Sequence, residues 1–212
     1  RERTDSFNNG RGTYTRSAAF LPGGGLVVGS STGEGRSDLR LISSAAGNRS
    51  VLLKIELKKK LDSVAVSPDG SLLAAAVNDQ DRTEQRHLGG EIKVFDAAGR
   101  AVHELKPGGG PVFSLNFTAD GKGLVYKTYL WDNGAKAYNL GRVMLRGLES
   151  GSESVLLEEK PGYGSGLFSY SRRDVAAVPV GSEEVLEIRK VPEGRLLATL
   201  NREAYKEKFR YT

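Results

Sequence analysis

LDSVAVSPDGSLLAAAV, residues 61–77, is the stretch that decides the fold. Two apolar runs flank the short segment SPDG, and proline and glycine are the residues that most strongly mark turns. The stretch therefore predicts two β-strands joined by a tight turn. Whether this hairpin stands alone or repeats along the chain determines the class of fold.

The strand–turn–strand pattern recurs three more times in the chain. The copies are AAFLPGGGLVVGS from Ala18, SLNFTADGKGLVYKT from Ser114 and LFSYSRRDVAAVPV from Leu167. When Pro22, Pro68, Ala119 and Arg172 are taken as equivalent, the units are spaced by 46, 51 and 53 residues. This period is at or just above the ~40 to 50 residues that one blade of a β-propeller occupies.

A second pair of β-patterned runs follows each of these hairpins. Apolar and polar residues alternate in EIKVFD, residues 91–96, as in a half-buried strand. The turns between these runs hold Gly47, Gly99, Gly151 and Gly194. Each unit therefore predicts four strands, and the units cover residues 17–58, 61–106, 111–159 and 165–200. The tail, residues 201–212, is expected to form a short helix or to start a further strand.

The second unit, VAVSPDGSLLAAAV followed by GEIKVFDAAGRAVHEL, resembles a blade of the WD-repeat and TolB-like propellers, and the resemblance extends from about Ser17 to Leu200. In such blades the third strand commonly ends in an aromatic residue and an aspartate. Phe95 and Asp96 occupy that place in this sequence. The dipeptide Trp131-Asp132 lies before the third strand of its unit and is expected to lead into a hairpin turn.

The pattern therefore predicts an all-β protein, a single β-propeller domain or part of one, with four recognisable four-stranded antiparallel blades. A flat β-sandwich is the alternative, but its strands do not usually repeat at this spacing. Small residues, namely Ala65, residues 74–76 and residues 176–177, are expected where sheets pack closely. Family propellers of this kind close with five to eight blades. Four blades leave three options: a compact ring, a piece of a larger propeller, or an open set that a partner completes.

Composition sets broad limits on function. The chain has 212 residues, 27 glycines, no cysteine and a formal net charge of +5. Its apolar runs are much shorter than the ~20 residues of a membrane-spanning helix, so no transmembrane segment is expected. Without cysteine the redox compartment stays open, and both cytoplasm and cell envelope are compatible. A signal peptide would already be absent from this sequence.

Catalytic motifs are poorly supported, and we expect no enzyme activity, metal or cofactor. His87 and His103 are the two histidines, which is too few for a histidine cluster that binds zinc. Residues 29–33 fit the pattern G-x-S-x-G, but no helix follows, as a nucleophile elbow requires. No phosphate-binding loop of the G-x-x-x-x-G-K-[ST] type is present.

Two long connections are the candidate partner-binding site. Residues 78–90 and 129–141 are expected to be equivalent loops on one face, because each links the second and third strands of its unit. Long loops of a propeller often carry function, and mixed charged and aromatic residues are typical of binding hot spots. The candidate residues are Asp79, Asp81, Arg82, Glu84, Arg86, His87, Tyr129, Trp131 and Tyr138.

The leading hypothesis is a non-catalytic scaffold that binds protein partners within a larger assembly. One alternative is the gating propeller of a hydrolase resembling prolyl oligopeptidase, with its catalytic domain outside these residues. A second alternative is a basic surface that binds nucleic acid or another acidic polymer. The modest excess of basic residues, 31 against 26 acidic ones, favours this only weakly.

Overall fold

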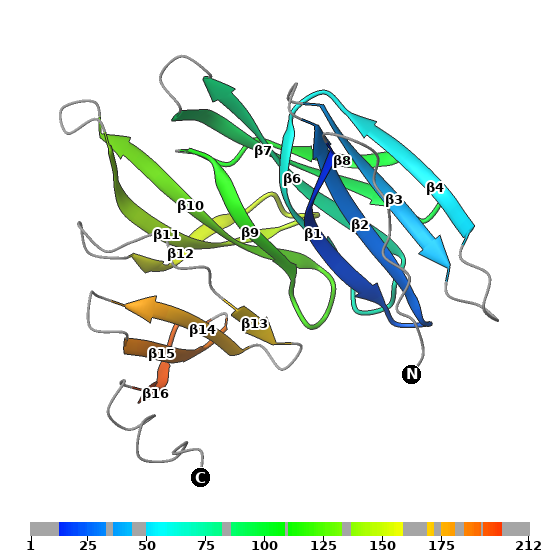
Figure 1. Ribbon diagram of the computed structural model, residues 1–212. Helices are drawn as coiled ribbons and strands as arrows, with labels where there is room; N and C mark the ends of the chain where they lie inside the picture. Colours follow the sequence, from blue (N-terminus) through cyan, green and yellow to red (C-terminus); the bar gives the residue numbers. More distant parts are fainter. Residues whose placement is uncertain are drawn as a thin grey trace, which may run out of the picture.

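The computed structural model consists of β-strands and turns in the part of the chain that it describes, with no helix there. The strands form four separate four-stranded antiparallel sheets (Figure 1). The predicted all-β class and the four-stranded antiparallel sheets are therefore confirmed. The described residues are 13–32, 36–43, 50–81, 86–108, 110–132, 137–158, 169–171, 175–180, 185–191 and 193–200.

Within each sheet the strands are hydrogen bonded in chain order, so each sheet is a simple meander. Sheet 1 holds β1 (Thr13–Leu21), β2 (Gly25–Thr32), β3 (Ser37–Ser43) and β4 (Ser50–Leu57). Sheet 2 holds β5 (Lys60–Val66), β6 (Leu72–Asp81), β7 (Arg86–Asp96) and β8 (Ala101–Leu105). Sheet 3 holds β9 (Val112–Phe117), β10 (Gly123–Asp132), β11 (Ala137–Gly147) and β12 (Glu153–Glu158). Sheet 4 holds β13 (Ser169–Ser171), β14 (Val175–Val180), β15 (Val185–Lys190) and β16 (Leu196–Leu200).

The four sheets span residues 13–57, 60–105, 112–158 and 169–200, one sheet for each repeat unit of the sequence. The β7–β8, β11–β12 and β15–β16 turns contain Gly99, Gly151 and Gly194, with φ of 81°, 64° and 66°. Phe95 and Asp96 end the third strand of sheet 2, and Trp131-Asp132 ends the second strand of sheet 3. Gly47 and the tail 201–212 lie outside the described residues.

The turn of the opening stretch is fixed by a local hydrogen-bond network. Asp69 Oδ1 accepts hydrogen bonds from Ser67 Oγ and from the Ser71 amide, at 2.6 and 3.1 Å. Ser67 Oγ in turn accepts from the Leu72 amide at 2.9 Å. Gly70 takes the left-handed φ of 78° that other residues rarely adopt. The turn residues thus set the β5–β6 register.

The corresponding turn of sheet 3, TADGK, repeats this network. Asp120 Oδ1 accepts from Thr118 Oγ1 at 2.6 Å and from the Lys122 amide at 3.0 Å. Thr118 Oγ1 accepts from the Gly123 amide at 2.9 Å, and Gly121 has a φ of 73°. Two units therefore share the chemistry of the turn as well as its sequence pattern.

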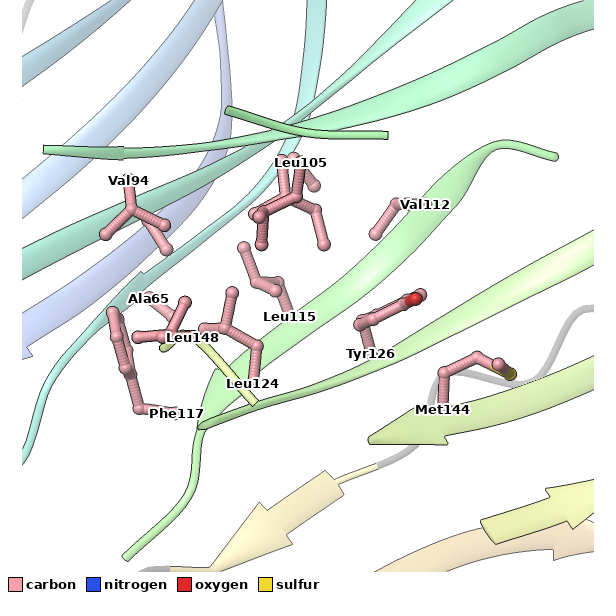
Figure 2. Close-up of a cluster of buried hydrophobic side chains, with 13 residues drawn as sticks. Ala65, Val94, Leu105, Val112, Leu115, Phe117, Leu124, Tyr126, Met144 and Leu148 are labelled. Carbon is pink, nitrogen blue, oxygen red and sulfur yellow. The ribbon is translucent and has the colours of Figure 1, made fainter. Parts of the chain in front are cut away.

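Consecutive sheets pack face to face through apolar side chains. One core lies between sheets 1 and 2 and includes Val27, Leu39, Leu61 and Phe95. A second core lies between sheets 2 and 3, where side chains of β7–β8 face those of β9–β11 (Figure 2). A smaller cluster joins Val125 and Val143 of sheet 3 to Val191, which follows β15.

Small residues occupy the middle of this stack, as expected. Ala74, Ala75 and Ala76 of β6 are fully buried. Ala74 and Ala76 belong to the core shared with sheet 3, whereas Ala75 belongs to the core shared with sheet 1. Strand β6 is therefore covered on both faces, and its short side chains let both neighbouring sheets approach.

Polar side chains also join neighbouring sheets, at equivalent positions. Asn78 of β6 donates to the carbonyl of Val112 at 2.9 Å and accepts from the Val112 amide at 2.8 Å. Between sheets 1 and 2, Ser31 Oγ donates to the Leu61 carbonyl at 3.3 Å, and Ser37 Oγ accepts from the Leu61 amide at 2.8 Å. In each case the first strand of one sheet is held by the preceding sheet.

The four sheets follow one another along an open arc, with sheets 1 and 4 at its ends (Figure 1). The first strands of sheets 1 and 2 are in contact on this arc. The Val64 amide of β5 donates a hydrogen bond to Ser17 Oγ of β1 at 3.1 Å. The tight turns also touch, since a Cβ added at Gly70 would lie 3.2 Å from Pro22 Cδ. The described sheets do not close into a ring.

Candidate functional site

The two connections that were expected to be loops are mostly strand. Strand β6 continues to Asp81 and β7 begins at Arg86, so that Gln80 pairs with His87 and Asp81 with Arg86. The loop prediction was wrong here because polar residues without alternation were taken as loop. A paired neighbour supplies the backbone hydrogen bonds that keep such a segment extended.

The hairpin of β10 and β11 is extended in the same way. Trp131 pairs directly with Tyr138, and Asp132 pairs with Ala137. Both hairpins carry a register irregularity near the end, between Asp79 and Gln80 and between Leu130 and Trp131. We call residues 78–81, 86–90, 129–132 and 137–141 the hairpin edge.

The hairpin edge gathers seven of the nine candidate residues on paired strands. Both hairpins project toward the upper left in Figure 1, so their ends lie on one side of the molecule. The residues placed there are Asp79, Asp81, Arg86, His87, Tyr129, Trp131 and Tyr138. Arg82 and Glu84 lie outside the described residues.

Asp79 takes part in an ion cluster at the base of the first hairpin. Lys59, in the β4–β5 connection, places Nζ 2.7 Å from Asp79 Oδ2 and 2.6 Å from Glu91 Oε1. Partial burial acts to lower the pKa of Lys59, but hydrogen bonds and charge from the two carboxylates outweigh it and raise that pKa. The cluster joins the base of the hairpin to the β4–β5 connection and leaves Asp79 half exposed, with 48% of its side chain accessible.

Tyr129 differs from the expectation of an exposed aromatic anchor, because it is only 5% exposed. Its ring packs edge to face on Phe113, with centroids 5.3 Å apart. The register places Tyr129 opposite Gly141, as Asn78 lies opposite Gly90 and Ser31 opposite Ser37. Tyr129 is therefore a packing residue at the base of the second hairpin.

Lys127 is a notable residue that sequence reasoning missed. It is fully buried in the second strand of sheet 3, and its Nζ lies 5.1 Å from the Tyr129 ring centroid. A lysine in the middle of a strand flanked by apolar residues, LVYKTYL, was the available signal. The contact is a cation–π interaction, which helps to hold a charge away from water.

The serine of the G-x-S-x-G pattern, Ser31, is part of a β-strand. Ser31 lies inside β2, where its hydroxyl is 2.8 Å from that of Ser37 and donates to the Leu61 carbonyl. A strand interior is not the strand-to-helix turn of a nucleophile elbow. Among the described residues, no group of three or more histidine, aspartate and glutamate side chains is placed to hold a metal.

Comparison with protein-family models finds no match for this sequence, and comparison with curated proteins finds none either. In the described part of the chain, no helix is long and apolar enough to cross a membrane.

Proposed function

We propose that the chain is a non-catalytic, propeller-like interaction module that binds a protein partner through the hairpin edge, as a subunit of a larger assembly. The observation that carries this proposal is the extension of the β6–β7 and β10–β11 hairpins. Each ends in paired rows of charged or aromatic residues on the same side of the molecule.

The arrangement of the sheets supports the propeller-like part of the proposal. Four meanders stack in chain order, and the first strand of one sheet is held by polar groups of the preceding one. Propellers stack four-stranded blades in this way around an axis. The open arc is consistent with further blades, from elsewhere in a longer chain or from a partner, covering its ends.

The residue types at the hairpin edge support the binding part. Asp81 lies opposite Arg86, and Trp131 lies opposite Tyr138. Tryptophan, tyrosine and arginine are the residues most enriched among binding hot spots. Paired strands fix the order of these residues along the backbone, which lowers the backbone entropy lost on binding.

Site-specific photo-crosslinking in cells that produce the full-length protein tests the proposal. A photoreactive residue replaces His87 or Trp131 in turn, and Val102, which is 45% exposed on the outer strand β8, serves as the control position. We expect a discrete crosslinked protein from positions 87 and 131 and none from position 102. The double variant Arg86→Ala/Trp131→Ala should reduce co-purification of that protein at least tenfold, with an unchanged unfolding midpoint.

Equal crosslinking from all three positions, or full retention of the partner by the double variant, would contradict the proposal. A hydrolase domain in the same full-length chain, crosslinked from positions 87 and 131, would instead support the gating-propeller alternative.

A further inference from the structure

A cavity of about 550 Å³ lies on sheet 1. It is formed where β2 ends and β3 begins, together with the end of β4 and the bend that follows it. Its volume falls within the range of small-molecule sites, ~300 to 1,000 Å³. We call it the sheet 1 cavity.

Two polar atoms at this cavity lack a hydrogen-bond partner in the part of the chain that the structure describes. Ser30, which is 1% exposed, and Asp38 are direct cross-strand neighbours. Within the described residues, neither Ser30 Oγ nor Asp38 Oδ1 has a partner, although both atoms are buried. Leaving such a group unsatisfied costs about 1–3 kcal/mol. A ligand that supplies a hydrogen-bond donor to Asp38 and any polar partner to Ser30 would recover this cost.

The charges around the cavity leave an excess of positive charge. Asp38 Oδ2 is paired with Arg40 at 2.7 Å, and Glu56 is paired with Lys54 at 2.9 Å. Arg36 and Lys58 also line the cavity, and both are exposed. Within the described residues, neither of these two cations forms an ion pair. They are therefore available to an anionic group of a ligand.

We propose that the sheet 1 cavity binds a small anion that also carries hydroxyl groups, with the size of a hexuronate or a hexose phosphate. The carboxylate or phosphate lies between Arg36 and Lys58. One hydroxyl donates to Asp38 Oδ1, and a second polar group pairs with Ser30 Oγ. Inorganic phosphate matches the cations but lacks the sugar hydroxyl groups, whereas an uncharged sugar matches only Asp38 and Ser30.

Titration calorimetry of the full chain with four probes tests the proposal: D-glucuronate, D-glucose 6-phosphate, inorganic phosphate and D-glucose. We expect saturable binding of glucuronate or glucose 6-phosphate, at least tenfold tighter than binding of inorganic phosphate or glucose. The tighter of the two charged sugars identifies whether the anionic group is a carboxylate or a phosphate.

Three variants locate the site. Arg36→Ala and Asp38→Ala should each weaken binding of the charged sugar at least fivefold, because the first removes a cation and the second removes the acceptor carboxylate. Ser30→Ala should also weaken binding, while the melting temperature of the unliganded protein stays the same or rises, since an unsatisfied buried hydroxyl is removed. Lys106→Ala, an exposed lysine between β8 and β9, is the control and should bind normally.

Absence of saturable binding by both charged sugars at millimolar concentration would overturn the proposal. Equal affinity for inorganic phosphate would also overturn it, because the hydroxyl groups would then contribute nothing. A Ser30→Ala variant that melts earlier but binds normally would show that Ser30 has a structural role only.

Discussion

Asp69 illustrates how a single side chain shapes the repeat at the residue scale. Hydrogen bonds from the Ser67 hydroxyl, the Ser71 amide and the Ser71 hydroxyl hold the pKa of Asp69 at about 2, below its ordinary value of 3.8. The carboxylate form is therefore the form that stabilises the turn. Its contribution is fully present above pH 3.8 and is lost as the pH falls through about 2.

We expect Asp69→Ala to lower the stability of the protein at pH 7, because three donors of the turn lose their acceptor. The difference in unfolding free energy between this variant and the natural protein should shrink as the pH falls from 4 toward 2, because the carboxylate of Asp69 is then protonated. Urea unfolding of both proteins at pH 7, 4 and 2.5 measures this difference.

The matching turn of sheet 3 provides an internal comparison. Hydrogen bonds from the Thr118 hydroxyl and the Lys122 amide also lower the pKa of Asp120, so Asp120→Ala should show the same decline of its effect in acid. A stability difference for Asp69→Ala that persists unchanged at pH 2.5 would show that the charge of Asp69 does not support the turn.

At the scale of elements, one amide supplies the polar attachment of β9 to β6. Asn78 is fully buried, and besides its two bonds to Val112 it donates to Asp62 Oδ2 at 2.6 Å. Its Nδ2 and Oδ1 are both used, and the Val112 backbone offers one donor and one acceptor to them. The amide orientation is therefore defined by its partners.

Asn78→Ala should destabilise the protein by roughly 3 kcal/mol, because it leaves the buried amide and carbonyl of Val112 without partners. Denaturant unfolding at pH 7 measures the change. Asn116→Ala is a matched control, since Asn116 lies in β9 and is only half-buried, and among the described residues no hydrogen bond uses its side chain. A loss below about 0.5 kcal/mol for Asn78→Ala would mean that sheets 2 and 3 do not depend on this amide.

The strands and their grouping could be predicted from the sequence because each unit combines alternation with a strong turn signal. The extended ends of β6 and β7 could not be predicted, because residues 78–81 and 86–90 show no alternation and their extension depends on pairing. The burial of Tyr129 depends on contacts within sheet 3 that a linear pattern does not reveal. The sheet 1 cavity also went unpredicted, because Ser30 and Asp38 become neighbours only through the β2–β3 register.

At the scale of the whole molecule, the central claim is that the sheets stack in chain order and leave the arc open between sheets 1 and 4. Repeat length alone indicates a propeller-like stack but not how many units close it. The physical basis of the stack is that a meander with two apolar faces must be covered on both. Sheets 2 and 3 each have a neighbouring sheet on both sides, whereas sheets 1 and 4 each have only one within the described residues.

Disulfide trapping tests this claim most directly, because the natural chain has no cysteine. Ser17 Oγ of β1 lies 3.1 Å from the Val64 nitrogen of β5, so cysteines at these two positions of sheets 1 and 2 are close enough to form a disulfide. The second pair is Phe20→Cys/Leu197→Cys, which places both thiols on exposed positions of sheets 1 and 4. We expect Ser17→Cys/Val64→Cys to form an intramolecular disulfide in the folded protein and Phe20→Cys/Leu197→Cys to stay reduced. The reverse result, with the second pair bridged and the first pair free, would contradict the open stack.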